Sequence, residues 1–196
     1  MPRIVDHAER REKIAAIVAG LLADLGVENT TIRKISHQSG LSRGLIEHYF
    51  TCKEEMISFA VKWINEQTLA RVVQEISHLK GLAALRRLTE LTLPLTEQSR
   101  REWKVRLQFW GLAVVNKKHQ IEQTKRIAVV EELFIKHLKE AQEIGEINAQ
   151  ANLELIAHSL LHRTYGLSCN AILRSGYFTA ERQLLALDHI MQEIAN

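Results

Sequence analysis

The chain has 196 residues, of which 46% are hydrophobic and 25% are charged, so it is long enough to bury a real core. Its net charge of +3 is too small to indicate nucleic-acid binding by itself, and any basic surface must come from local placement. Only two prolines are present and no low-complexity run interrupts the chain. Because proline is a strong helix breaker, this scarcity favours an all-α fold.

No stretch is apolar enough to span a bilayer, and charges stand near the N-terminus where a signal peptide would be apolar. We therefore expect a cytoplasmic protein without membrane contact. Neither the cysteines, Cys52 and Cys169, nor the nine histidines follow a metal-ligand spacing, so no metal and no other cofactor is expected. A redox-sensing role for either cysteine is left open.

The first predicted element is an amphipathic helix over residues 8–25, which Gly26 is expected to end. The cations near its start do not complement the helix dipole, so we expect them to serve something outside the helix. These cations are Arg10, Arg11 and Lys13. The apolar face is formed by Ile14, Ile17, Val18, Leu21, Leu22 and Leu25.

Two short helices are predicted next, over residues 32–39 and 43–50. Threonines before the first, and Ser42 before the second, offer capping oxygens. Gly40 permits the positive φ that a sharp turn between helices needs. A pair this short does not bury itself, so the first and fourth helices must complete its core. The side chains expected to point inward are Ile32, Ile35, Leu41, Ile46 and Phe50.

The outward side of this pair is basic. Over residues 29–53 there are four Lys or Arg and one Glu, so the local charge is 4 − 1 = +3. A second short helix of this kind can enter the major groove with its N-terminal residues nearest the bases. Arg43 stands at that N-terminus, and Gly44 leaves room for DNA to approach. The pattern therefore predicts a helix-turn-helix.

The order of residues resembles the N-terminal domain of TetR-type repressors. The resemblance rests on T-x-x-x-I at 31–35, S-G-L-S at 39–42 and H-Y-F-x-x-K at 48–53. It implies phosphate contacts by Thr31, Tyr49 and Lys53, and base contacts by Arg43, Gly44 and His48. Ser36 stands where the family more often has alanine. The full set of expected DNA-binding residues is Thr31, Arg33, Ser42, Arg43, Gly44, His48, Tyr49 and Lys53.

The rest of the chain predicts further helices, so we expect an all-α protein of about nine helices. A fourth helix begins near Lys53, and the others cover residues 81–95, 99–116, 120–143, 152–174 and 179–194. Ser99 is expected to cap its helix, with Glu102 at the capping-box spacing. The predicted domains are a helix-turn-helix over 1–53 and a ligand-sensing and dimerisation bundle over 54–196.

The family resemblance implies a homodimer that pairs through the last two long helices. Leu184, Leu187, Met191 and Ile194 form a candidate seam in the last of them. The alternative is a helix buried within a monomer. Two copies would place two reading helices on two half-sites of a palindromic DNA operator.

Aromatic residues from four predicted helices suggest an effector pocket. Their faces would attract a cation such as a quaternary ammonium group, although each one taken alone could be plain core. The stretch Leu107–Trp110, followed by 116–120, is similar to the choline-responsive repressors of glycine-betaine synthesis. The candidate ligand-binding residues are Trp63, Trp103, Phe109, Trp110, Phe134 and Tyr165.

Residues 100–126 are strongly basic, with eight Lys or Arg against two Glu, a balance of 8 − 2 = +6. A solvated surface, a site for an acidic ligand and a second DNA contact are all open for this stretch.

We therefore expect a DNA-binding transcriptional repressor that a small-molecule effector releases from its operator. A helical enzyme is the first alternative, but no nucleophile–base pair, phosphate-binding loop or metal cluster supports it. An interaction module without DNA binding is the second, and it would show no salt-dependent affinity for DNA.

Overall fold

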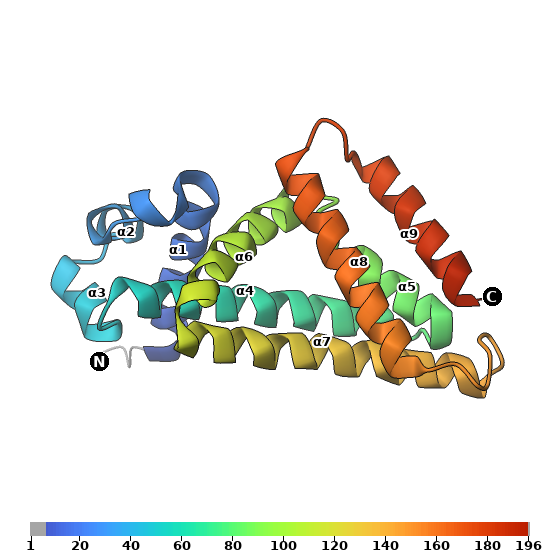
Figure 1. Ribbon diagram of the computed structural model, residues 1–196. Coiled ribbons are helices and arrows are strands. Elements are labelled where there is room, and N and C mark those ends of the chain that lie inside the picture. Colours follow the sequence, from blue (N-terminus) through green and yellow to red (C-terminus); the bar gives the residue numbers. More distant parts are fainter. Residues whose placement is uncertain (1–6, 196) are drawn as a thin grey trace.

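The computed structural model describes residues 7–195, and within this range the chain forms nine α-helices and no strand, which confirms the all-α prediction (Figure 1). The helices are α1 (His7–Asn29), α2 (Ile32–Ser39), α3 (Arg43–Tyr49), α4 (Lys53–Ile76), α5 (Gly81–Thr92), α6 (Glu97–Val115), α7 (Lys117–Glu143), α8 (Leu153–Leu173) and α9 (Ala180–Ala195).

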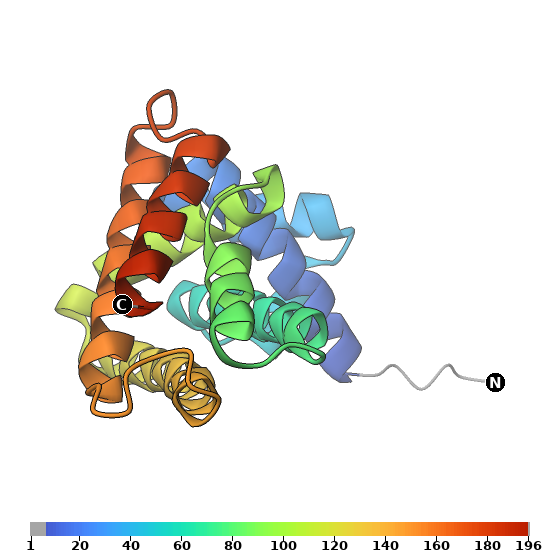
Figure 2. The ribbon, with the colours of Figure 1, turned by 90° about the vertical axis from the view of Figure 1, so that its right-hand side faces the viewer.

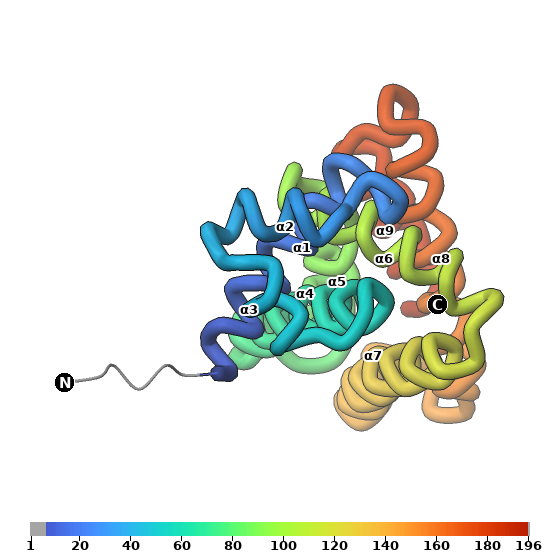
Figure 3. The backbone as a smooth tube through the Cα atoms, turned by 90° about the vertical axis from the view of Figure 1, so that its left-hand side faces the viewer, coloured from blue at the N-terminus to red at the C-terminus, as the bar shows by residue number. Residues whose placement is uncertain are grey.

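Helices α1, α2 and α3 lie together at one end of the molecule (Figure 3). Gly26, with φ 77° and ψ 172°, interrupts the helical path of α1, and a further turn then continues to Asn29, beyond the predicted end. Thr30 is buried below this break, and its hydroxyl donates to the Gly26 carbonyl at 2.7 Å. The regular first helix thus ends at Gly26, as predicted, and the glycine changes the direction of the chain before α2.

One cation near the start of α1 serves the fold itself. Arg11 Nη2 lies 3.3 Å from Glu55 Oε1 on α4. The Arg11 guanidinium also stacks over the rings of Phe50 and Phe59, 5.0 Å and 4.6 Å from their centroids. Arg11 therefore serves partners outside its own helix, as expected, and these partners belong to the fold. Lys13 departs from the expectation, because its ammonium pairs with Glu9 of the same helix.

Side-chain caps fix the starts of the later helices. Thr96 caps α6: its hydroxyl accepts from Ser99 N, and its own backbone N–H donates to Ser99 Oγ. Ser99 is therefore the third residue of the helix and not its cap, contrary to the prediction. Asn116 caps α7 by accepting from the backbone of Lys118 and His119. Asn152 caps α8 as expected.

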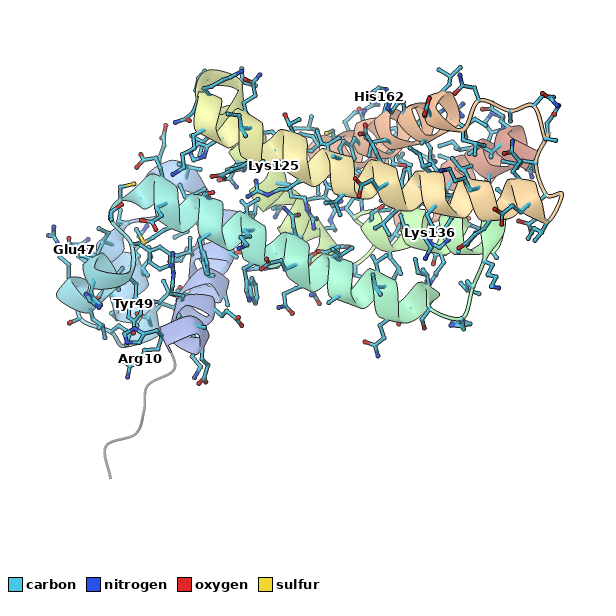
Figure 4. All side chains as sticks on the ribbon, turned by 90° about the horizontal axis from the view of Figure 1, so that it is seen from below. Arg10, Glu47, Tyr49, Lys125, Lys136 and His162 are labelled. Carbon is cyan, nitrogen blue, oxygen red and sulfur yellow. The ribbon has the colours of Figure 1, made fainter. Side chains whose placement is uncertain are left out.

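The long helices α4 and α7 run side by side along the length of the molecule (Figures 1 and 4). One hydrophobic core joins α1–α3 to the start of α4 and to the end of α6 through Phe109 and Ala113. A second core joins the end of α4 to α5, α7, α8 and α9. Helix α4 belongs to both cores and therefore connects the two ends of the protein.

Helices α8 and α9 lie side by side at one edge of the molecule (Figure 2), and α9 also packs on α5. In α9, Leu187 and Met191 are only 1% and 8% exposed, because they face the chain's own core. Leu187 and Met191 are therefore not available to an intermolecular seam, contrary to the prediction. The outer faces carry other apolar residues, namely Leu155 and Leu173 on α8, Leu185 on α9 and Tyr177 between the two helices.

Candidate DNA-reading surface and effector cavity

The turn between α2 and α3 is held by short-range hydrogen bonds. Thr31 caps α2 by accepting from Lys34 N, and Ser42 caps α3 by accepting from Leu45 N, both at 3.3 Å. Gly40 takes φ 68° between the helices, as the sequence predicts. The Ser36 hydroxyl donates to the Leu41 carbonyl at 2.6 Å, which ties α2 across the turn. This role of Ser36 is not evident from its position in the sequence.

The inward side of the pair is apolar, as predicted. Ile35, Ile46 and Phe50 are nearly inaccessible, while Ile32 and Leu41 are half-buried against the same core. Burying one such side chain stabilises the fold by about 1.5–3 kcal/mol. This fixes which faces of α2 and α3 remain for a partner.

The outward side of α3 is open to solvent. Arg43 is 75% exposed and its Nε lies 2.7 Å from Glu47 Oε1 on the same helix. Exposed ion pairs of this type are weak, so Arg43 can exchange Glu47 for another partner at little cost. An added Cβ at Gly44 would meet no atom within 4 Å, so the helix presents bare backbone there. His48 is also exposed.

The eight predicted DNA-binding residues lie at one end of the molecule, on α2, α3, their caps and the first residue of α4. Figure 4 labels Tyr49 and Glu47 at this end, together with Arg10 of α1. Tyr49 is half-buried, and its ring centroid lies 5.6 Å from that of His48. Lys53 Nζ lies 3.5 Å from the Glu28 carbonyl. All eight except Tyr49 and Lys53 are exposed.

A second feature is a cavity of about 270 Å³ between α4, α5, α6, α7 and α8. Four of the six predicted ligand-binding aromatics line it, namely Trp103, Trp110, Phe134 and Tyr165. Its size and mainly apolar wall with a few polar groups are typical of small-molecule sites.

Three of these aromatics form a mutual cluster. The centroid of Trp103 lies 5.7 Å from that of Trp110 and 5.6 Å from that of Tyr165, and the Trp110–Tyr165 distance is 5.2 Å. Trp103 Nε1 donates to the Thr92 carbonyl at 2.6 Å, which fixes its ring. Burial raises the pKa of Tyr165 to about 12, so its phenol stays protonated near neutral pH.

Two of the six predicted aromatics do not line this cavity. Phe109 is fully buried in the core beneath the DNA-reading end, where its ring contacts His119. Trp63 lies on the side of α4 that faces α1. The sequence places all six on helices of the bundle, but only packing decides which faces meet.

Sequence reasoning missed the two arginines of the cavity wall, Arg106 and Arg126, although the basic stretch 100–126 contains both. Arg106 is held in place: its Nη2 donates to Thr68 Oγ1 at 2.8 Å, its Nε donates to Asn65 Oδ1 at 3.0 Å, and Glu102 lies 3.7 Å away. Burial lowers the pKa of this guanidinium, and Glu102 opposes the shift.

Among residues 7–195, no three His, Cys, Asp or Glu side chains are placed to hold a metal ion. In the same range, no helix combines the length and apolar character that crossing a membrane requires.

A capped helix-turn-helix at one end and an aromatic cavity in the bundle define the architecture of a DNA-binding regulator with a candidate effector site. Residues 19–58 match the tetR family of bacterial regulatory proteins, and residues 82–195 match the C-terminal region of BetI-type transcriptional repressors. The chain belongs to this family of ligand-responsive transcriptional repressors, which bind DNA and are not enzymes.

Individual relatives agree with this assignment. The chain is 30% identical to the HTH-type transcriptional regulator PksA of Bacillus subtilis over 116 residues, which span 58% of this chain and 56% of that protein. It is 22% identical to the HTH-type transcriptional regulator BetI of Vibrio campbellii over 98% of this chain and 96% of the relative. A solved transcriptional regulator from Saccharomonospora viridis in complex with choline has the same fold, with a TM-score of 0.88, 22% identity and coverage of 94% and 96%.

Proposed function

We propose that this repressor binds a palindromic operator as a homodimer, with α3 of each copy in a major groove. The observation that carries this proposal is the outward face of α3, where Arg43, Gly44 and His48 are exposed behind the Ser42 cap. Arg43 and His48 would read bases, and Thr31, Tyr49 and Lys53 would hold phosphates. Arg33 and Ser42 flank these contacts. Acting on DNA, the protein would work in the cytoplasm.

The dimer would form through α8 and α9. Leu155 is 66% exposed, Leu173 78% and Leu185 62%, which is unusual for large apolar side chains in two adjacent helices. A symmetric pairing would cover these faces with their own copies. Two reading helices would then meet two half-sites about one DNA turn, or a multiple of it, apart.

The effector would bind in the cavity lined by Trp103, Trp110, Phe134 and Tyr165. The choline bound by the Saccharomonospora viridis regulator is the effector class that the resemblance implies, because aromatic faces attract quaternary ammonium groups. The functional division would fall at 53/54, where α4 begins. Since α4 carries Lys53 at one end and cavity residues further along, it would transmit occupancy to the DNA-reading end.

Selection of operators from random DNA by the purified protein tests this function. We expect an enriched inverted repeat, strong weakening of binding as salt rises, and two chains in each complex by sedimentation. Enrichment of single half-sites by a monomer would contradict the dimer. A lack of affinity for any DNA would contradict the proposed operator binding altogether.

A further inference from the structure

The charged side chains around the cavity do not suit a simple cation. Arg106 and Arg126 both line it, from α6 and α7. Among the described lining residues the one carboxylate is Glu66, whose side chain is 60% exposed and lies 3.6 Å from Lys62. A quaternary ammonium group in this cavity would meet three cationic side chains, Lys62, Arg106 and Arg126, against this single carboxylate, which already interacts with Lys62 and with the charge of Arg126.

Of the two arginines, Arg126 is the one that still has a hydrogen-bond donor available for a ligand. Its partner is Glu122, 3.5 Å from Nη2, and its guanidinium stacks over the Phe109 ring at 4.7 Å. Nη1 is buried and has no hydrogen-bond partner among the described residues. Arg106, in contrast, is already bonded to Asn65 and Thr68 and paired with Glu102. A buried guanidinium donor without an acceptor is costly, so an acceptor supplied by a ligand would be favourable.

We propose that the effector of this protein is a small apolar molecule carrying an anionic group, and that Arg126 is the anchor for that anion. This proposal rests on the effector site proposed above, and it changes the chemical class of the ligand. The aromatic cluster of Trp103, Trp110 and Tyr165 holds the apolar part of the molecule. A carboxylate is the simplest head that matches a guanidinium in both charge and geometry.

Binding of an anion to Arg126 also affects the contacts of α4, the helix that begins at the DNA-reading end. Glu122, the present partner of Arg126, accepts a hydrogen bond from Ser58 on α4. Ser58 lies one and a half turns beyond Lys53, the first residue of that helix. An anion that competes with Glu122 for the guanidinium therefore alters the one described side-chain hydrogen bond that ties α7 to α4 near the reading helices.

Binding of four probes to the full chain by calorimetry tests the ligand class: octanoate, octanamide, octylamine and choline. The first three share an unbranched eight-carbon skeleton and differ in head charge. We expect octanoate to bind most tightly, and Arg126→Met to weaken octanoate by about 10- to 100-fold while octanamide changes little. Lys125→Met is the matched control, since Lys125 is the exposed neighbour on α7 (Figure 4) and should leave all four affinities unchanged.

Arg126→Lys guards against a folding defect, because it keeps the charge without the planar fork and should retain an intermediate preference for octanoate. Tighter binding of octylamine or choline than of octanoate would overturn the proposal. So would an unchanged octanoate preference in Arg126→Met, or no binding of octanoate to the wild type.

Operator affinity provides a separate readout of the coupling. Octanoate should lower operator affinity in the wild type and have little effect in Arg126→Met, while Ser58→Ala should bind octanoate normally but respond less on DNA. An equal response in all three would contradict the coupling. Failure of the wild type to bind any DNA would count against the proposed operator function and leave the probe affinities as an independent test of the ligand class.

Discussion

Arg43 on α3 and Arg106 on α6 carry the same guanidinium group in opposite surroundings. The Arg43 side chain is 75% exposed and pairs with Glu47 of its own helix, whereas that of Arg106 is 14% exposed and is bonded to Asn65 and Thr68 of α4. Replacing its present partner by another costs little free energy for the exposed Arg43 and much more for the buried Arg106. The DNA-reading end thus keeps the charge of Arg43 available, while the cavity end builds the charge of Arg106 into the fold.

This contrast says where mutations should act. Changes on the outward face of α3 should alter DNA affinity and leave stability almost untouched. Changes in the cavity wall should alter stability first, because wall residues such as Trp103 and Phe134 are almost completely buried.

The largest effect is expected for Trp103→Ala. Trp103 is 2% exposed, its indole donates to the Thr92 carbonyl, and its ring packs on two other aromatics. Removing it should lower the free energy of unfolding by about 3–5 kcal/mol, from the cavity created and the lost hydrogen bond. Denaturant melts measure this, with Trp63→Ala as the control, since Trp63 is half-buried on the other side of α4. Equal losses in both variants would mean that the cavity wall is not special to stability.

At the other end, Arg43→Ala should weaken specific operator binding by about 1–3 kcal/mol. The free energy of unfolding should change by no more than about 0.5 kcal/mol, because only an exposed ion pair is lost. Anisotropy titrations on operator and random DNA measure the loss of operator binding.

Lys53→Ala is the matched comparison for Arg43→Ala. If Lys53 holds a phosphate, its loss should weaken binding to every sequence and lower the salt slope by about one. Unchanged operator affinity in Arg43→Ala would mean that α3 does not read bases through this residue.

The helix-turn-helix and the cavity also differ in how much of their structure can be predicted from the sequence. The bounds of α2, the cap at Ser42 and the positive φ of Gly40 follow from residues within a few positions of one another. Caps and turns of this kind can be predicted from the sequence because their hydrogen bonds join residues that are close together in the chain. The TetR resemblance rests on the same short segment.

The cavity depends on which faces of distant helices meet, and periodicity alone does not decide this. It places aromatics on the right helices but does not separate Trp110, which lines the cavity, from Phe109, its neighbour in the core. From sequence alone, the basic stretch 100–126 is consistent with a solvated surface, a site for an acidic ligand and a second DNA contact. In the folded protein, Arg106 and Arg126 line the cavity, whereas Lys117 and Lys125 are exposed to solvent.

The smallest expected effect concerns the junction between the two regions, at the start of α4. The Thr51 backbone N–H and hydroxyl both donate to Glu55 Oε2, at 2.8 and 2.9 Å, and Arg11 lies against the other oxygen. These hydrogen bonds, with the charge of Arg11, lower the pKa of Glu55 below its ordinary value. A carboxylate with a lowered pKa stabilises the fold above its unfolded pKa, and the contribution disappears as pH falls through the folded pKa.

Glu55→Gln should therefore cost about 1 kcal/mol of unfolding free energy at neutral pH, a modest loss because the site is partly open to solvent. The difference from the wild type should shrink as the solution is acidified below the ordinary glutamate pKa, because the wild type then loses the same charge. Chemical denaturation across an acid-to-neutral series measures it, with the exposed Glu12→Gln as the control. A difference that stays constant down to the lowest pH would show that Glu55 acts through packing and not through its charge.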